Sequence, residues 1–187
     1  MKYSNNELLK IINPMPSARY CITVPVSSVK RTLDGWGENG STNVNINPDF
    51  QRGRVWSLNK QIAYMENLIR GYAPNKILFN CPEFLYSCGN DCDLNPNEIV
   101  CIDGLQRISS ALDFMGGKFK LFNGKLSYSD LNCSHFSTKR IHFEFQMYEI
   151  AKRAELLQFY LSLNTGGVVH SKSEIQRVRD LLNQSLG

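Results

Sequence analysis

The chain has 187 residues, of which 42% are apolar and 20% charged, with a net charge of +4 and a pI near 8.7. This length suits one domain over residues 1–187, and the mild positive charge is compatible with nucleic acid, nucleotides or acidic partners without choosing among them. No stretch approaches the roughly 18 apolar residues of a membrane span, and the first ten residues lack the apolar centre of a secretory signal, so we expect a cytoplasmic protein with no membrane partner.

The first half of the chain predicts one strand and two helices. Residues 20–26 (YCITVPV) have the composition of a strand, and residues 27–36 follow with apolar residues on one helical face. A polar loop is expected over residues 37–45. The second helix should span about residues 58–70, where apolar residues recur every three or four positions and Gly71 is placed to end the helix.

The second half adds strands that precede or follow helical patterns. Three short runs are typical of strands: residues 76–80, 98–102 and 140–148. The first two should form an antiparallel pair joined by a cysteine-bearing loop. A helix follows the second, with a buried face predicted at Leu105, Ile108, Leu112 and Met115. Further helices are expected over about 149–163 and from Ser171, where Ser171–Glu174 fits a capping box. The pattern predicts an α+β fold, with helices packed on a small mixed sheet.

The six cysteines are too few and too irregularly spaced for a secreted disulfide framework, so reduced thiols are expected. Cys81, Cys88 and Cys92 could hold a zinc ion. They lack paired C-x-x-C spacing and a nearby histidine, so a hairpin with incidental thiols is the favoured interpretation.

The stretch Asp103-Gly104-Leu105-Gln106-Arg107 lies at a strand-to-helix junction. A helix N-terminus has unpaired N–H groups and favours negative charge, and a glycine there lets a phosphate approach the backbone. Arg107 in the first turn opposes the helix dipole but suits a bound phosphate. Asp103 could hold Arg107 or a Mg²⁺ ion, and Gln106 could orient a water or a phosphate oxygen. The structural alternative is an Asp–Arg pair that braces an ordinary turn.

Two other polar clusters favour a site over a simple turn. Gln51, Arg52 and Arg54 lie between Phe50 and Trp56, just before a helix, and basic groups interleaved with aromatic ones suit phosphate and base contacts, although they also suit an ordinary surface patch. The third cluster is LNTGGVVH (163–170), where a plain helix-to-helix turn is the alternative.

Together these segments resemble the N-terminal domain of GmrSD-type modification-dependent restriction enzymes, a ParB/sulfiredoxin-like domain marked by DGQQR. The resemblance rests on Pro48-Asp49-Phe50-Gln51-Arg52 with Trp56, on Asp103-Gly104-Leu105-Gln106-Arg107, and on Leu163-Asn164-Thr165-Gly166-Gly167 with Glu174. Order and spacing agree over about residues 20–180. The resemblance implies binding and hydrolysis of a nucleoside triphosphate at DGQQR, in systems that restrict modified or foreign DNA.

Residue by residue, the resemblance implies a catalytic group and a phosphate-binding group. The catalytic group is Asp103, Gln106 and Arg107, with Asp103 as the Mg²⁺ ligand. The phosphate-binding group is Gln51, Arg52, Gly104, Arg107, Asn164, Thr165 and Gly166. Leu105 replaces the first glutamine of DGQQR and should face the core, so nucleotide binding is a firmer expectation than catalysis.

Three functions follow as hypotheses. The leading one is a nucleotide-binding domain that hydrolyses nucleoside triphosphates on or near DNA, in restriction, defence or counter-defence. The alternative is a non-catalytic module that binds DNA or a protein partner through the same fold. A stand-alone ParB-like nuclease is the third. The three histidines form no HNH pattern, so we expect no complete HNH nuclease.

Overall fold

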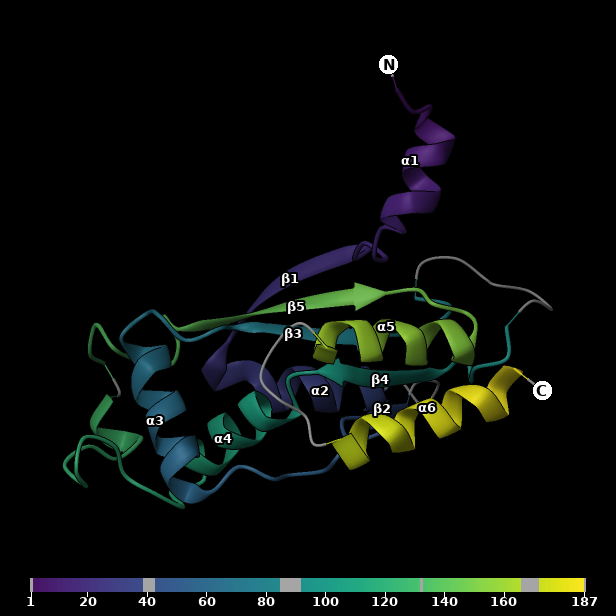
Figure 1. Ribbon diagram of the computed structural model, residues 1–187. Coiled ribbons are helices and arrows are strands. Elements are labelled where there is room, and N and C mark those ends of the chain that lie inside the picture. The colour runs from purple at the N-terminus through teal and green to yellow at the C-terminus, as the bar shows by residue number, and fades with distance from the viewer. Residues whose placement is uncertain (1, 39–42, 85–91, 132, 166–171, 187) are drawn as a thin grey trace.

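A five-stranded mixed sheet with helices on both faces forms the centre of the molecule (Figure 1). The computed structural model describes residues 2–38, 43–84, 92–131, 133–165 and 172–186. The helices are α1 (Asn5–Ile12), α2 (Val29–Glu38), α3 (Leu58–Ile69), α4 (Leu105–Met115), α5 (Arg153–Thr165) and α6 (Lys172–Leu186), with short 3₁₀ turns η1 (Val26–Ser28) and η3 (Ser129–Leu131). The strands are β1 (Tyr20–Pro25), β2 (Asn43–Asn45), β3 (Lys76–Asn80), β4 (Glu98–Asp103) and β5 (His142–Tyr148).

The strand order is β1-β5-β3-β4-β2, and the sheet contains both pairing modes. β1 pairs antiparallel with β5, and β3 pairs antiparallel with β4, as the sequence predicts for residues 76–80 and 98–102. The β3–β5 and β2–β4 pairs are parallel. The predicted α+β fold, helices on a small mixed sheet, is therefore confirmed.

The two faces of the sheet bury separate hydrophobic clusters. Alternation in β5 sends Phe143, Phe145 and Met147 to the face that is covered by α2, α3 and α4. Leu78 of β3 and Ile102 of β4 point the other way, into a second cluster with α5 and α6. Because the ends of β3 and β4 are packed on both faces, the polar residues at the β4–α4 junction are held by a rigid frame.

Three expectations differ from the structure. The predicted polar loop over 37–45 contains β2. Two of the three residues of β2 are asparagines, so the sequence shows no alternation of apolar and polar residues there, and the strand pairs with β4 through backbone bonds next to that from Asn43 N to Asn97 O. The predicted helix over 149–163 begins only at Arg153. Helix α1 was not expected. It begins with a Ser4–Glu7 capping box, has no buried residue and projects away from the sheet (Figure 1).

The late start of α5 has an identifiable cause in a buried asparagine. Asn80, fully buried at the end of β3, accepts a hydrogen bond from Ile150 N at 2.8 Å and donates one to Ile150 O at 3.0 Å. The carbonyl of Ile150 is thereby bonded to Asn80 and not to an N–H of a helical turn, and α5 begins three residues later. None of the described helices combines the length and apolar character that a bilayer crossing requires.

We predict that Asn80→Ala lowers the free energy of unfolding by about 3 kcal/mol, because it leaves a buried N–H and a buried C=O of Ile150 without partners. Urea denaturation measures this change. The control is Asn183→Ala on the exposed face of α6, which should stay within about 0.5 kcal/mol of the parent. Equal values for both variants would contradict the role given to Asn80.

Candidate functional site

The β4–α4 junction places its glycine against the neighbouring strand. Gly104 is the N-cap residue of α4 and has a φ of +119°, a backbone conformation that residues with a side chain rarely adopt. A Cβ at Gly104 would lie 2.6 Å and 2.8 Å from side-chain carbons of Ile77. The sequence interpretation linked this glycine to phosphate approach; the structure shows that contact with β3 requires it whether or not a phosphate binds.

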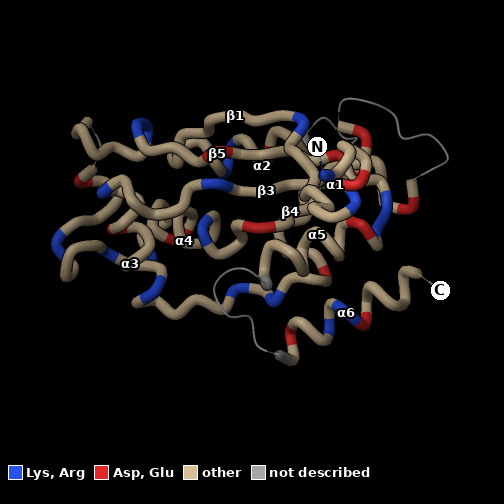
Figure 2. The backbone as a smooth tube through the Cα atoms, turned by 45° about the horizontal axis from the view of Figure 1, so that its top comes forward, with Lys and Arg blue, Asp and Glu red and all other residues tan. Residues whose placement is uncertain are grey.

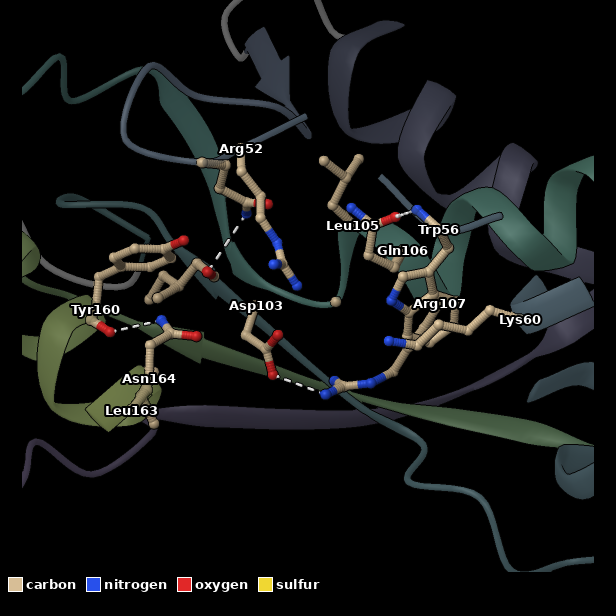
Figure 3. A pocket seen from close by; sticks show the side chains of 13 residues that line it. Arg52, Trp56, Lys60, Asp103, Leu105, Gln106, Arg107, Tyr160, Leu163 and Asn164 are labelled. Atoms are coloured by element: carbon tan, nitrogen blue, oxygen red, sulfur yellow. Dashed lines mark hydrogen bonds and ion pairs between the residues drawn. The ribbon is translucent and has the colours of Figure 1, made fainter. Parts of the chain in front are cut away.

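A pocket of about 290 Å³ opens in front of this junction (Figure 3). Its walls come from the segment before α3, the β4–α4 junction and the C-terminal half of α5. The lining residues are Gln51, Arg52, Trp56, Lys60, Ile102, Asp103, Gly104, Leu105, Gln106, Arg107, Tyr160, Leu163 and Asn164. All three sequence clusters therefore reach one pocket, although more than 100 positions separate Gln51 from Asn164.

Asp103 and Arg107 form an ion pair at one side of the pocket. Arg107 Nη2 donates to Asp103 Oδ2 at 2.9 Å, and Arg107 Nη1 donates to the carbonyl of Lys76 at the start of β3. The Arg107 side chain is 19% exposed, and that of Asp103 is 43% exposed. Two independent anchors thus fix the guanidinium, and the carboxylate remains accessible from the pocket.

Arg52 reaches the same pocket from another direction and is held by α6. Figure 3 shows its guanidinium pointing toward Asp103, and Arg52 Nη1 lies 3.5 Å from Glu174 Oε2. One helical turn further, Arg177 donates to the backbone carbonyls of Asp49, Phe50 and Gln51. α6 therefore sets the position of the loop that bears Arg52.

The side chains of the two glutamines of the site form hydrogen bonds with backbone groups. Gln51 Nε2 donates to Cys101 O at 2.6 Å and to Ile102 O at 3.3 Å, which fastens its loop to β4. Gln106 Oε1 accepts from Val55 N and Trp56 N, both at 3.1 Å, and its Nε2 donates to Gly53 O. The expected role of Gln106 in orienting a water or phosphate is not what this structure shows, because both ends of its amide are used to position residues 53–56.

α5 supplies the remaining wall. Asn164 Nδ2 donates to Tyr160 O at 2.7 Å, and its side chain points into the pocket in Figure 3. Burial raises the pKa of Tyr160 to about 12, although Arg52 and Arg177 act to lower it, so the phenol is neutral at pH 7. Thr165 ends α5, whereas Gly166 of the phosphate-binding prediction lies outside the described residues.

Cations outnumber carboxylates among the residues that line the pocket. Its charged lining residues are Arg52, Lys60, Arg107 and Asp103, which is three cations against one carboxylate. Figure 2 shows acidic and basic positions spread over the whole backbone, including an acidic position on β4 and basic positions on α3 and α4. α4 directs its N-terminal N–H groups here, and Gly104 provides no side chain to cap them. An anion with several oxygens fits this arrangement.

The metal predictions concern Asp103 and the cysteines. Within the described ranges, no group of three or more His, Cys, Asp or Glu side chains could hold a metal ion by itself. Asp103 fits the usual Mg²⁺ mode, in which one or two carboxylates act together with substrate phosphates. Cys88 of the zinc prediction lies outside the described residues, whereas the thiols of Cys81 and Cys92 both face backbone carbonyls within hydrogen-bond distance.

Sequence reasoning missed three contributors to the site. Lys60 lies in the first turn of α3 with Nζ 5.0 Å from the Trp56 ring, and Tyr160 was read only as part of a helix. Arg177 was missed because its role depends on three carbonyls that lie 126–128 positions away. The available signal was weak: Glu174 and Arg177 are three residues apart and so share one face of α6. By contrast, the expected inward position of Leu105 is confirmed, since it is 2% exposed.

Comparison with known proteins gives one match. The family described as GmrSD restriction endonuclease, N-terminal domain, matches residues 37–179, which include every residue that lines the pocket. No curated protein and no solved structure matches, so the ParB/sulfiredoxin-like assignment of the fold stays a prediction.

We predict that Gly104→Ala lowers the free energy of unfolding by roughly 3 kcal/mol, since strain at positive φ adds to the clash with Ile77. The matched control is Gly117→Ala, because Gly117 has a φ of +74° and no atom within 4 Å of its would-be Cβ. The control should cost only about 1 kcal/mol. Equal losses in urea denaturation would remove the contact with Ile77 as the reason for the glycine.

Proposed function

Because this chain belongs to the family of N-terminal domains of GmrSD restriction endonucleases, we propose that its pocket binds the phosphates of a nucleoside triphosphate and that this binding serves the restriction of DNA. Membership of the family implies a role in restriction. The observation that supports the nucleotide is the convergence of Arg52, Lys60, Arg107 and Asp103 on one pocket at a helix N-terminus.

Arg107 and Arg52 would bind the phosphates from different sides of the pocket. Arg107 is pre-oriented by Asp103 and by the Lys76 carbonyl, so little side-chain entropy is lost when it pairs with a phosphate. Arg52 faces it across the pocket, so phosphate oxygens between the two guanidinium groups neutralise both. The N–H groups of the first turn of α4 add partial positive charge on the same side.

Hydrolysis would depend on Asp103. A water attacks the terminal phosphorus, the bond to the bridging oxygen breaks, and a nucleoside diphosphate and phosphate leave. Asp103 is the only carboxylate among the described lining residues, so it is the group that would accept the proton of the water or hold Mg²⁺ together with the phosphates. Mg²⁺, when bound, supplies charge neutralisation of the β- and γ-phosphates.

A specific observation favours a second candidate, a non-catalytic binding module. Gln51 and Gln106 donate to backbone, Leu105 is buried, and Asp103 is paired with Arg107. Neither glutamine amide of the described pocket is thus left to orient a water, whereas every cation stays in place for binding. Release of inorganic phosphate from each nucleoside triphosphate with Mg²⁺ distinguishes the two candidates.

We predict that a bound triphosphate raises the melting temperature. At a ligand concentration 100 times the Kd, ligand that binds only the folded state adds about 2.7 kcal/mol, or roughly 5–10 °C for a chain of this size. Differential scanning fluorimetry with each triphosphate and Mg²⁺ measures the shift. Absence of any shift at millimolar concentration would argue against nucleotide binding altogether.

We predict that Arg107→Ala weakens nucleotide binding roughly thirtyfold, because it removes charged hydrogen bonds to phosphate. Asp103→Asn should keep most of the affinity, since Arg107 retains its bond to the Lys76 carbonyl, and should slow hydrolysis about a hundredfold. Calorimetry and phosphate release measure the two effects.

The control for both variants is Arg31→Ala, an exposed position on α2 outside the pocket. Circular dichroism confirms that each variant is folded. If Asp103→Asn loses as much affinity as Arg107→Ala, the carboxylate serves only to brace the arginine.

A further inference from the structure

A second groove, of about 490 Å³, lies at the C-terminal end of α3. It runs between the α3–β3 connection and the segment that leads into β5, which lie at the same end of the molecule in Figure 1. Leu68, Ile69 and Ile141 give it an apolar floor. The proposed nucleotide pocket does not use any of these residues.

One exposed aromatic ring lines this groove, and a second belongs to a residue between two lining residues in the sequence. Phe136 lines it and is 58% exposed, and Tyr72, at 72% exposed, stands between the lining residues Gly71 and Ala73. Both exceed the exposure of every other Phe and Tyr side chain among the described residues. Rings of this size are costly to leave in water, and the absence of bulky side chains at Gly71 and Ala73 leaves their surroundings open to a planar ligand.

The polar lining of the groove is cationic or neutral. Arg140, His135, His142 and Asn75 contribute to it, and no Asp or Glu does. Lys139, which precedes Arg140, is exposed as well. No ion pair within the described part of the chain involves Arg140 or Lys139, so their charges are available to an anionic partner.

The walls of the groove are fixed by hydrogen bonds. Asn75 Nδ2 donates to His142 O at 3.1 Å, and Asn75 O accepts from Glu144 N at 3.0 Å. Tyr64 donates its hydroxyl hydrogen to Pro74 O at 3.0 Å, which ties the connection to α3. The groove is thus a built feature of the fold, and its shape does not depend on a ligand.

We propose that this groove binds a single nucleic-acid strand, with a base stacked on Phe136 above the apolar floor and the neighbouring phosphates on Arg140 and Lys139. Exposed aromatic rings interleaved with cations are the chemistry that holds single strands without sequence preference. An acidic peptide would use the cations alone and leave the rings and the apolar floor without partners. The proposal deepens the role in DNA restriction by naming a surface for the DNA strand.

The geometry also relates the groove to the pocket. Asn75 lines the groove, and the next residue, Lys76, gives its carbonyl to Arg107 in the pocket. Lys60 and Ile69, which line the pocket and the groove respectively, lie nine positions apart on α3, or about 14 Å along its axis. A bound strand would therefore lie close to the nucleotide without occupying its site.

Fluorescence anisotropy with a short fluorescein-labelled oligothymidylate tests the proposal. Phe136→Ala should weaken binding about tenfold through lost stacking. Arg140→Gln should weaken binding and reduce the slope of log affinity against log salt concentration by about 0.7, the value for one phosphate contact with a single strand. Both positions are exposed, so the fold should not change.

Matched controls are Tyr3→Ala and Arg31→Gln, an exposed aromatic and an exposed arginine away from the groove. Both should bind the oligonucleotide as the parent does. If the groove variants bind as well as these controls, the proposal is overturned. It is also overturned if free thymidine monophosphate competes as strongly as the oligonucleotide, since the groove would then be a mononucleotide site, or if only duplex DNA binds and Phe136→Ala has no effect.

Arg107→Ala separates this proposal from the nucleotide proposal. It should retain oligonucleotide binding while triphosphate binding falls. If only triphosphate binding is absent, the proposal for the groove is retained and the proposal for the pocket is rejected. If the protein binds the triphosphate normally but does not bind the oligonucleotide, the reverse holds.

Discussion

The backbone hydrogen bonds of residues 49–56 are the constraint on which the pocket depends. This segment has no helix or strand of its own, and side chains from other elements bond several of its carbonyl and N–H groups. Arg177 of α6 donates to the carbonyls at its start, and Gln106 of α4 bonds both kinds of backbone group near its end. Without these contacts Arg52 would have no defined place, and the pocket would lose a wall.

The same contacts explain why so polar a motif occurs at the β4–α4 junction. An ordinary turn would need only the glycine, which here also makes room for Ile77. Gln106 holds the adjacent loop, Asp103 orients Arg107, and Arg107 is tied back to β3. The motif is therefore a brace that joins β3, β4 and the pocket loop, and the same brace presents a guanidinium and a carboxylate to any ligand in the pocket.

α3 connects the two surfaces for which ligands are proposed. Its first turn supplies Lys60 to the pocket at the β4–α4 junction, and its last residues, with Ile141, form the floor of the groove beside Phe136. Since α3 and α4 pack against each other beneath the sheet, a shift of either helix would alter both surfaces. α3 is therefore a direct structural link between the two proposed ligand sites.

Local patterns in the sequence were sufficient for β1, β3, β4 and β5, for the buried positions of Leu105 and Ile108 on α4 and for the membership of the family, because alternation, helical spacing and turn residues record which side of each element is buried. Leu112 and Met115 of the predicted face are only partly buried, whereas Phe114 is fully buried. The local patterns also marked Asp103, Arg107 and Arg52 as site residues. They could not show β2, whose three residues include two asparagines and give no apolar alternation, nor the late start of α5, which depends on Asn80 some 70 positions away. The positioning roles of Gln106 and Arg177, and the groove beside Phe136, arise from contacts between segments distant in the chain, and such contacts leave no periodic trace in the amino-acid sequence.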